Sequence, residues 1–394
     1  MSDQQRRRRA GFPQMILIAT MLSHLTVVLP FTQGFALLGA PWPLAFGVAL
    51  AGLLAWLVRG RVQAVIWDTP RPAWRLLYVD EPYYAHWCAT FVGGPLQLLL
   101  LLGSLGLDLA LGRPLHLPGT ASLGLYLFML TLGFYSVKIR RRWVRIRRHD
   151  VEIDGLDPAF DGYRIVQLSD LHIGGMLPPG LGERWVAMAN AEAADLTVVT
   201  GDLVTSGVNF HDEIAALLAR LTARDDVVVS MGNHDYFGEG DPLIDKMRAA
   251  GLTVLRNDSQ MIRRGSAQLR LSAVDDLWTA RADLARTLAG PKPAPTVLLA
   301  HDPKLFDQAA DLGADFMLSG HTHAGQLALP FLVRQVNLAK IAYAYTYGFY
   351  RRGRATLYVH AGLGTTGPPA RFGAAPELAV FTLRPTPGRP PAAA

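Results

Sequence analysis

The first third of the chain is dominated by long stretches that contain no Asp, Glu, Lys or Arg. Three such stretches cover residues 10–58, 82–107 and 114–137. A helix of about 20 apolar residues crosses the hydrocarbon core of a bilayer. The first stretch is long enough for two crossings, with a natural break between Pro30 and Gly34. Four such runs in succession disfavour the alternative, which is a set of buried core helices in a soluble protein. We expect four transmembrane helices, near residues 13–30, 36–58, 85–107 and 119–138.

Almost all of the basic residues that flank these expected helices lie on one side. Arginines fill positions 6–9, further basic residues lie within 59–75 and 138–148, and the loops on the other side contain only Arg113. Lys and Arg favour the cytoplasmic side. The pattern therefore predicts a multi-pass protein of the inner or plasma membrane, with both ends and the C-terminal domain in the cytoplasm. The arginines before the first apolar run also resemble a twin-arginine export signal, which would place that domain outside. Three further apolar runs and a basic stop favour the anchor.

The distribution of charge argues against a nucleic-acid partner. The formal net charge is +6, but 11 basic residues lie in the two clusters 6–9 and 138–148. The rest of the chain is therefore acidic overall, and no basic patch continues into the C-terminal part. Basic clusters beside a membrane helix bind anionic lipid headgroups. We expect membrane lipids, and no nucleic acid, as partners.

Cys88 is the single cysteine, which excludes an intrachain disulfide.

After Arg148 the pattern changes to short apolar runs that alternate with helical patterns. Such alternation predicts an α/β domain whose sheets are covered by helices. We expect strands at 163–168, 196–200, 227–230, 253–255, 269–274, 296–300, 316–318, 355–359 and 378–383. Helices are expected near 181–194, 211–223, 241–250, 280–288 and 303–312. The expected organisation is a basic N-terminus (1–12), a transmembrane region (13–140), a basic juxtamembrane linker (141–160), an α/β domain (161–384) and a disordered Pro- and Ala-rich tail (385–394).

Five of the expected strands end in Asp, Asn or His. The sequences that follow them are LSDLH, TGD, MGNHD, AHD and SGHTH. In α/β sheets, sites assemble at the carboxyl ends of strands, so these side chains are expected to converge. The candidates for metal binding are Asp170, His172, Asp202, Asn233, His301, His321 and His323.

The seven candidates offer oxygens and imidazoles, with no thiol among them. That set suits Mn, Fe, Zn or a similar ion and disfavours a closed structural zinc site. Seven donors exceed what one tetrahedral ion binds, whereas two divalent ions that share a carboxylate accommodate them. Two such ions clamp the attacking and leaving oxygens of a displacement at phosphorus. Each histidine taken alone is also consistent with a structural role, but the joint pattern favours a metal site.

The ordered set D-x-H, G-D, G-N-H-D, H and G-H-T-H resembles the motifs of the calcineurin-like metallophosphoesterase superfamily. The resemblance covers residues 163–383. SGHTHAGQ, together with GLGTTGPPARF, is similar to a bacterial branch of membrane-associated phosphoesterases, some of which act on lipid-linked substrates. Ala324 stands where that branch usually has glycine. The resemblance implies an α/β fold of two packed mixed β-sheets flanked by helices, here preceded by an all-α region of four transmembrane helices.

The resemblance also implies a role for each motif residue. Asp202 would bridge the two ions together with a hydroxide. His234 would contact the phosphoryl oxygen or protonate the leaving group, with Asp235 orienting its ring. Arg371, in ARFG, either binds a substrate phosphate or lies on the surface. One ion would take Asp170, His172, Asp202 and His323, and the other would take Asp202, Asn233, His301 and His321.

These features together predict a membrane-anchored, two-metal hydrolase of phosphate esters or pyrophosphates. The anchor suggests a phospholipid or a lipid-linked nucleotide as the substrate. The protein Ser/Thr phosphatases of the superfamily carry an arginine shortly after G-D, whereas this chain reads GDLVTSG, which disfavours a protein substrate. The alternative function is a non-catalytic scaffold that recruits a partner to the membrane, and the complete set of motif residues disfavours it.

Overall fold

The computed structural model describes residues 14–387, apart from 16, 67, 113–117 and 293. The chain divides after Ile139 into two compact units. The expected basic N-terminus (1–12) lies outside the described residues, as does most of the expected disordered tail (385–394).

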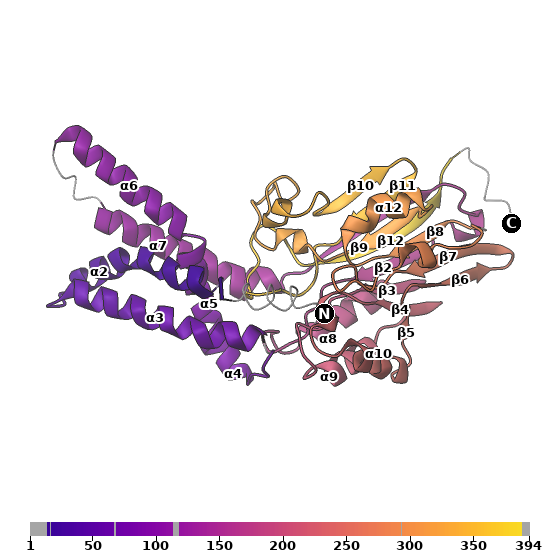
Figure 1. Ribbon diagram of the computed structural model, residues 1–394, viewed down its shortest axis with the longest axis horizontal. Helices are drawn as coiled ribbons and strands as arrows, with labels where there is room; N and C mark the ends of the chain where they lie inside the picture. The colour runs from indigo at the N-terminus through magenta and orange to yellow at the C-terminus, as the bar shows by residue number, and fades with distance from the viewer. Residues whose placement is uncertain (1–13, 16, 67, 113–117, 293, 388–394) are drawn as a thin grey trace. The chain divides into compact units, whose positions relative to one another are not determined.

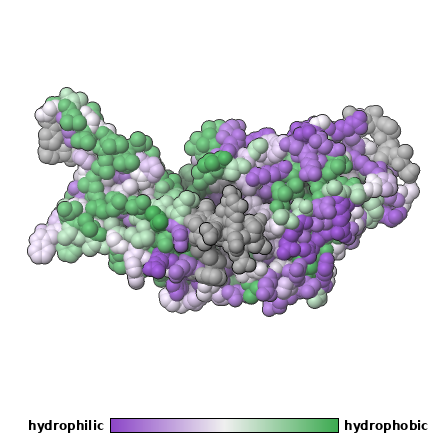
Figure 2. All heavy atoms as spheres, viewed as in Figure 1, coloured by the Kyte–Doolittle hydropathy of each residue, from purple (hydrophilic) through white to green (hydrophobic). Residues whose placement is uncertain are grey.

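The described part of the first unit consists of helices and the loops that join them. Its helices are η1 (His24–Val27), α2 (Val28–Leu37), α3 (Pro43–Ile66), α4 (Ala73–Arg75), the π-helical turn η2 (Leu76–Asp80), α5 (Glu81–Phe91), α6 (Gly94–Leu111), α7 (Pro118–Phe134) and the π-helical turn η3 (Tyr135–Ile139). Four helical stretches are long and apolar enough to cross a membrane: Leu17–Leu37, Pro43–Gln63, Ala73–Leu111 and Pro118–Arg142. Many of their large apolar side chains are exposed, and Figure 2 shows hydrophobic residues over much of this unit. The four long apolar helices predicted from the sequence are therefore confirmed.

The break between the first two helices was predicted wrongly. It falls at residues 38–42 instead of between Pro30 and Gly34. Pro30 is the third residue of α2. Proline is tolerated in the first turn of a helix because its missing N–H would have no intrahelical acceptor there.

Polar side chains inside the first unit are paired. Gln97 of α6 donates to the carbonyl of Ser122 of α7 at 2.9 Å, and the Ser122 hydroxyl donates back to Gln97 at 2.7 Å. Asp80 is fully buried and forms ion pairs with three arginines of the basic 59–75 segment. The buried Glu81 pairs with Lys138 at 2.6 Å. Carboxylates thus neutralise part of the positive charge that the sequence places at this end of the helices.

The second unit contains two mixed sheets of six strands each (Figure 1). The first sheet has the order β1 (Arg145–Ile153), β12 (Glu377–Pro385), β2 (Arg164–Leu168), β3 (Leu196–Thr200), β4 (Asp226–Ser230) and β5 (Thr253–Val254). The second has the order β10 (Gly348–Arg352), β11 (Ala355–Val359), β9 (Phe316–Ser319), β8 (Thr296–Leu299), β7 (Ala267–Ala273) and β6 (Asp258–Arg264). The α-helices are α8 (Leu181–Ala191), α9 (His211–Leu218), α10 (Gly240–Ala249), α11 (Leu284–Thr287) and α12 (Phe306–Asp311). The short 3-10 turns are η4 (Arg140–Arg142), η5 (Pro158–Phe160), η6 (His234–Tyr236), η7 (Pro303–Leu305), η8 (His323–Gly325) and η9 (Leu338–Ile341).

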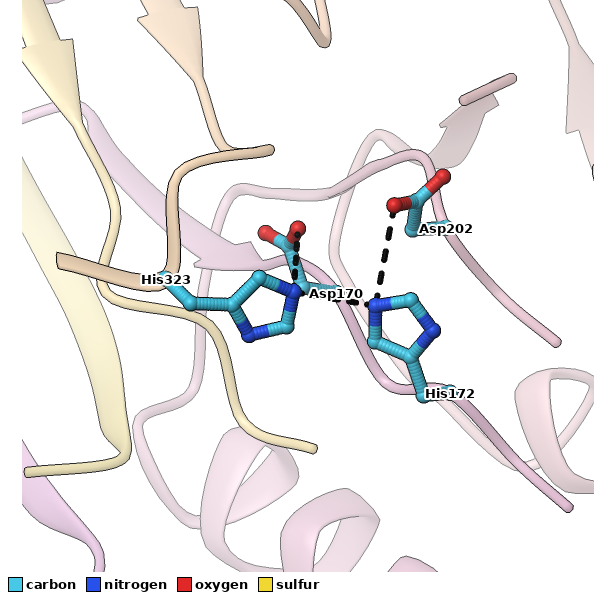
Figure 3. Close-up of side chains that lie close together, drawn as sticks. All are labelled: Asp170, His172, Asp202 and His323. Atoms are coloured by element: carbon cyan, nitrogen blue, oxygen red, sulfur yellow. Dashed lines mark hydrogen bonds and ion pairs between the residues drawn. The ribbon is translucent and has the colours of Figure 1, made fainter. Parts of the chain in front are cut away.

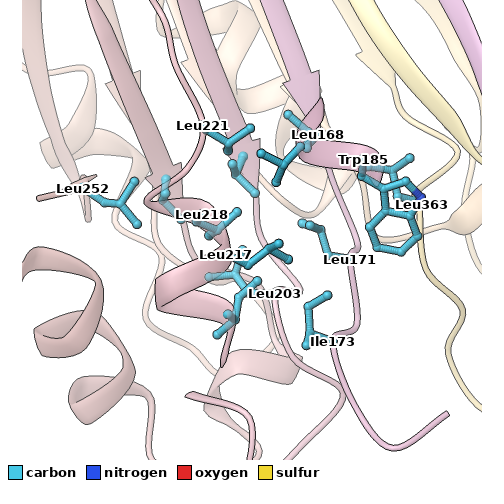
Figure 4. Packing of buried hydrophobic residues seen from close by; sticks show 14 of the residues in the cluster. Leu168, Leu171, Ile173, Trp185, Leu203, Leu217, Leu218, Leu221, Leu252 and Leu363 are labelled. Atoms are coloured by element: carbon cyan, nitrogen blue, oxygen red, sulfur yellow. The ribbon is translucent and has the colours of Figure 1, made fainter. Parts of the chain in front are cut away.

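Three apolar layers hold the second unit together. Alternate residues of a strand point to opposite faces of its sheet. On β2, Val166 and Leu168 therefore pack against α8, α9 and α10, as Figure 4 shows for Leu168 and its neighbours, whereas Ile165 packs into the layer between the sheets. The second sheet packs its outer face against α12 through residues such as Phe306. The predicted fold of two packed mixed sheets flanked by helices is confirmed.

Strand β1 occupies residues 145–153 of the expected linker at 141–160. It pairs in parallel with β12 over residues 145–153 and forms an edge of the first sheet. Its sequence, RIRRHDVEI, is charged over most of its length, and only Val151 and Ile153 are fully buried. Charged side chains are typical of edge strands, because one face and one edge meet solvent. The edge strands β6 and β10 were likewise not predicted.

The place of β1 in the sheet generates a stability prediction for truncated second units. A chain that begins at residue 155 loses β1, whereas a control chain that begins at residue 143 keeps it. Burial of a Val or Ile side chain contributes about 1.5–3 kcal/mol. Loss of Val151 and Ile153 therefore removes a large part of a typical stability of about 5–15 kcal/mol. We expect a midpoint of thermal unfolding lower by more than 10 °C for the shorter chain, measured by circular dichroism. Equal midpoints would mean that β1 contributes nothing to the fold.

Candidate metal centre and active site

The candidate site lies where loops from both sheets meet. Parallel strands β2, β3 and β4 of the first sheet and β8 and β9 of the second end at these loops. The backbone N–H of His321, after β9, donates to Asp170 Oδ1, after β2, at 2.9 Å. The Gln167 amide of β2 donates to the carbonyl of Ser319 of β9 at 3.2 Å. These two bonds fix the loops of one sheet against those of the other.

The first group of candidate donors is Asp170, His172, Asp202 and His323. Each offers a ligand atom within 4.8 Å of the others, and all four are buried (Figure 3). The Nε2 atoms of His172 and His323 are 3.0 Å apart. His323 Nε2 is 3.3 Å from Asp170 Oδ1, and His172 Nε2 is 3.6 Å from Asp202 Oδ2. This group of oxygen and nitrogen atoms could hold a metal ion.

The second group contains Asp202, His301 and His321, so Asp202 belongs to both groups. His301 Nε2 is 3.2 Å from Asp202 Oδ2 and 3.2 Å from His321 Nδ1. His301 Nδ1 donates to the carbonyl of Thr200 at 2.8 Å, which leaves Nε2 as the free donor atom. Asn233 precedes His234, whose backbone N–H donates to Asp202 Oδ1 at 2.9 Å. Asn233 Oδ1 is buried and has no hydrogen-bond partner among the described residues.

Five of the seven candidate donors adopt left-handed backbone conformations. Their φ angles lie between 47° and 70°: Asp170, His172, Asp202, His321 and His323. A non-glycine residue in this region costs of order 1–3 kcal/mol and is kept only where the surroundings hold it. The turns that follow β3 and β4 also lie so close together that their backbones are nearly in contact. A Cβ on Gly201 would lie 2.6 Å from the backbone nitrogen of Gly232.

Burial and mutual charge shift the pKa values of the group. Burial raises the pKa of Asp170 to about 6, against the opposing charge of His301. Burial would also raise the pKa of Asp202, but the nearby His301 and His234 hold it well below its usual range. Burial lowers the pKa of His172 and of His323 well below the ordinary value. Neutral His172 and His323 beside an ionised Asp202 are in the protonation states that a metal ion requires. Burial would lower the pKa of His301 as well, but the adjacent carboxylate of Asp202 raises it well above the ordinary value.

Asp235 does not orient the ring of His234, contrary to the expectation from the motif. Its carboxylate accepts backbone N–H bonds from Asp202, Leu203 and Val204 at 2.7–3.3 Å and from Gly232 at 2.8 Å. The ring of His234 is held instead by Thr205, whose carbonyl accepts from Nδ1 at 2.6 Å. A buried carboxylate surrounded by backbone N–H groups has no lone pair directed at the imidazole. Asp235 therefore holds the loop that carries Asp202.

Arg371 is neither on the surface nor available to a substrate phosphate. Its side chain is fully buried and donates to the carbonyls of Ala361 at 2.7 Å and Gly364 at 2.6 and 3.0 Å. Its Nη2 also lies 3.2 Å from Nδ1 of His323. Because its N–H groups are turned to the backbone, Arg371 supports the loop behind His323. Both alternatives predicted for Arg371 are therefore wrong.

Tyr343 reaches the site without a signal in the sequence. Its hydroxyl is 2.5 Å from Nε2 of His321, and burial raises its pKa. It lies in the stretch AYAYTYGFY, where spacing does not separate one tyrosine from the next. Only the path of the chain after β9 brings it to His321.

Comparisons with known proteins agree with this geometry. The family model for calcineurin-like phosphoesterases matches residues 163–325. The chain is 32% identical to an uncharacterized metallophosphoesterase, YkuE, of Bacillus subtilis. The match extends over 257 residues and covers 64% of this chain and 90% of that protein. An uncharacterized metallophosphoesterase of Helicobacter pylori is 30% identical, over 71% of this chain and 74% of its own length. A transmembrane protein with metallophosphoesterase domain of Danio rerio is 30% identical, over 60% of this chain and 56% of its own length.

The chain belongs to the calcineurin-like phosphoesterase family. Its fold, its buried Asp and His groups and its relatives together define a metal-dependent phosphoric ester hydrolase.

The hydrogen bonds of Asp235 lead to a prediction that tests whether this residue supports the loop of Asp202 or takes part in catalysis. In Asp235→Asn, either orientation of the amide turns an NH₂ group toward backbone N–H groups. Each buried donor left unsatisfied costs about 1–3 kcal/mol. We expect a lower midpoint of thermal unfolding and weaker retention of metal, measured by thermal unfolding and by elemental analysis. The control is Asp241→Asn, because Asp241 is exposed and pairs with Arg256 at the surface, so both properties should be unchanged. A variant of Asp235 with full stability and full metal content would contradict the supporting role.

Proposed function

We propose that this protein is a membrane-anchored phosphoesterase that uses two divalent ions, such as Mn, Fe or Zn, to hydrolyse a phosphate ester or pyrophosphate. The observation that carries the proposal is the pair of donor groups that share one buried carboxylate, Asp202. A single structural ion would need only one of these groups. Each group combines oxygen and imidazole donors, which suit these ions.

The proposed division of donors follows the two groups. Asn233 is added to the second group because its buried side-chain oxygen has no partner among the described residues. When bound, two such ions lower the pKa of a water molecule and offset the negative charge that develops on the phosphoryl oxygens. Asp170, His172, Asp202 and His323 would hold the first ion. Asp202, Asn233, His301 and His321 would hold the second.

His234 is the proposed proton donor to the leaving oxygen. Its Nδ1 is tied to the carbonyl of Thr205, so Nε2 is the ring atom left for the substrate. The ring is partly buried and packs edge-on against His172, with 4.7 Å between the ring centroids. In its protonated form, His234 can bond a phosphoryl oxygen and then protonate the departing oxygen. General acid catalysis of this kind contributes about 10²–10⁴-fold in rate.

The helical unit is proposed to anchor the enzyme in the inner or plasma membrane. The four apolar helical stretches and the basic residues within 59–75 and 138–148 support a multi-pass arrangement with the catalytic unit on the cytoplasmic face. We place the boundary of the catalytic unit near residue 140 rather than 161, because β1 belongs to the first sheet. A substrate at the membrane, either a phospholipid or a lipid-linked nucleotide, fits this arrangement.

Turnover with and without metal tests the proposed function. The full-length protein is assayed with a chromogenic phosphodiester in Mn²⁺ and after chelation, beside Asp202→Asn. Asparagine keeps the shape of the side chain but removes the charge that both donor groups share. We expect turnover that requires metal, and a loss of at least 10³-fold in the variant. Metal-independent turnover, or a fully active variant, would contradict the two-metal site. Bound metal without turnover of any phosphodiester or pyrophosphate would favour the non-catalytic scaffold.

The role of His234 has its own test. We expect His234→Ala to retain the metal content of the unaltered protein while its turnover falls about 10²–10⁴-fold. Metal content is measured by elemental analysis and turnover with the same chromogenic diester. Asp202→Asn is the contrasting variant, since it should lose both metal and rate. A metal-free His234→Ala protein, or one with full activity, would show that His234 is not the proton donor.

A further inference from the structure

A stretch of exposed apolar side chains follows the site loop of β9. We call residues 329–341 the apolar loop. Among the described residues of the second unit, six of the ten exposed large hydrophobic side chains lie within it. Phe331 is fully exposed and Ile341 is 88% exposed. The others are Leu329, Leu332, Val336 and Leu338. Figure 2 shows a hydrophobic patch over the segment that follows β9. Clusters of this kind mark sites that bind a membrane or another protein.

The apolar loop is held in place by hydrogen bonds at its base. Ala328 forms a β-bridge with Asn337, and the Leu329 N–H donates to the carbonyl of Val336 at 3.0 Å. Asn337 is buried, and its amide donates to the carbonyl of Val333 at 2.7 Å. Phe331 has a φ of 68°, a strained conformation for a bulky residue. The loop therefore presents its apolar side chains outward from a defined backbone.

The same segment is joined to the candidate active site. The hydroxyl of Tyr343, two residues beyond the loop, lies 2.5 Å from Nε2 of His321. Thr322, between the two histidines of the site, donates to the carbonyl of Thr346 at 2.8 Å. Whatever the loop binds is thus held close to the donors of the second group.

Charge indicates the chemistry of that partner. No Asp or Glu occurs between Asp315 and Glu377, whereas six basic residues do. Two of the six, Arg334 and Lys340, are exposed within the apolar loop itself. Exposed apolar side chains interspersed with Lys and Arg are typical of segments that lie in the interface of an anionic bilayer. An apolar surface for another protein would not need a segment free of carboxylates.

We propose that the apolar loop inserts into the surface of an anionic phospholipid bilayer and holds the active site at that surface. The substrate class implied by this placement is a phosphate ester or pyrophosphate carried by a lipid. This inference rests on the proposed function for its substrate, but the insertion of the loop can be tested without turnover.

Fluorescence tests the insertion directly. The full-length protein is reconstituted in phosphatidylcholine vesicles with and without phosphatidylglycerol. An environment-sensitive dye is attached to F331C or, as control, to L312C, with Cys88 changed to alanine in both. Leu312 is also an exposed apolar residue of the second unit. We expect a blue shift, and quenching by lipids with brominated acyl chains, for F331C alone and more strongly with phosphatidylglycerol. Equal behaviour at both positions would overturn the proposal, as would a shift that follows protein density instead of lipid, which indicates contact between copies.

Activity tests the consequence for the substrate. The double variant F331S/I341S and the control L312S are assayed with phosphatidyl p-nitrophenol in the vesicles and with soluble methyl p-nitrophenyl phosphate. We expect the ratio of lipid to soluble turnover to fall at least tenfold in the double variant and to stay constant in the control. Equal losses on both substrates, or no loss on either, would overturn the proposal. If the unaltered protein hydrolyses neither diester, the implied lipid phosphodiester substrate is ruled out, and fluorescence alone decides whether the loop inserts.

Discussion

The ionised carboxylate of Asp202, buried between two groups of histidines, is the interaction on which the rest of the site depends. One of its oxygens lies 3.2 Å from His301 and 3.6 Å from His172, and the other accepts the backbone N–H of His234. Burial alone would protonate this acid, but His301 and its neighbours hold its pKa well below the usual range. In return, Asp202 raises the pKa of His301 well above its ordinary value, although burial opposes this. Asp202 and His301 therefore form a buried ion pair, and a buried charge persists only where it is paired or binds a metal ion.

The fold secures this arrangement through its backbone. Loops from both sheets carry the donors, and five donors are held at positive φ. The carboxylate of Asp235 gathers four backbone N–H groups around the turn that carries Asp202. The buried Arg371 does the same with carbonyl groups behind His323. Two buried polar side chains, Asp235 and Arg371, therefore hold loops in place, which explains how a strained site persists next to a well-packed core.

Much of the fold and of the candidate site could be predicted from the sequence. Buried strands such as β2 and β3 are short runs rich in Ile, Val and Leu, and the seven candidate donors follow five such runs in a recognisable order. The predictions were wrong where a side chain's partner is distant in sequence or its strand lies at an edge. The charged strand β1 resembled a linker because its partner, β12, lies more than 200 residues away. Asp235 and Arg371 stand within sequence motifs, but most of their hydrogen bonds are to backbone groups. A motif specifies residue types and does not show which backbone groups they contact.

The sequence by itself determined the four long apolar helices and the α/β character of the C-terminal part, because periodicity and composition record burial along each element. The order of its motifs also named the candidate donors. Only the tertiary structure decided which donors share Asp202, that Thr205 holds His234, that Tyr343 reaches His321, and that the side chains of residues 329–341 point outward. These features depend on loops whose conformation is set by hydrogen bonds between segments far apart in the chain. No local pattern of residue types encodes such bonds.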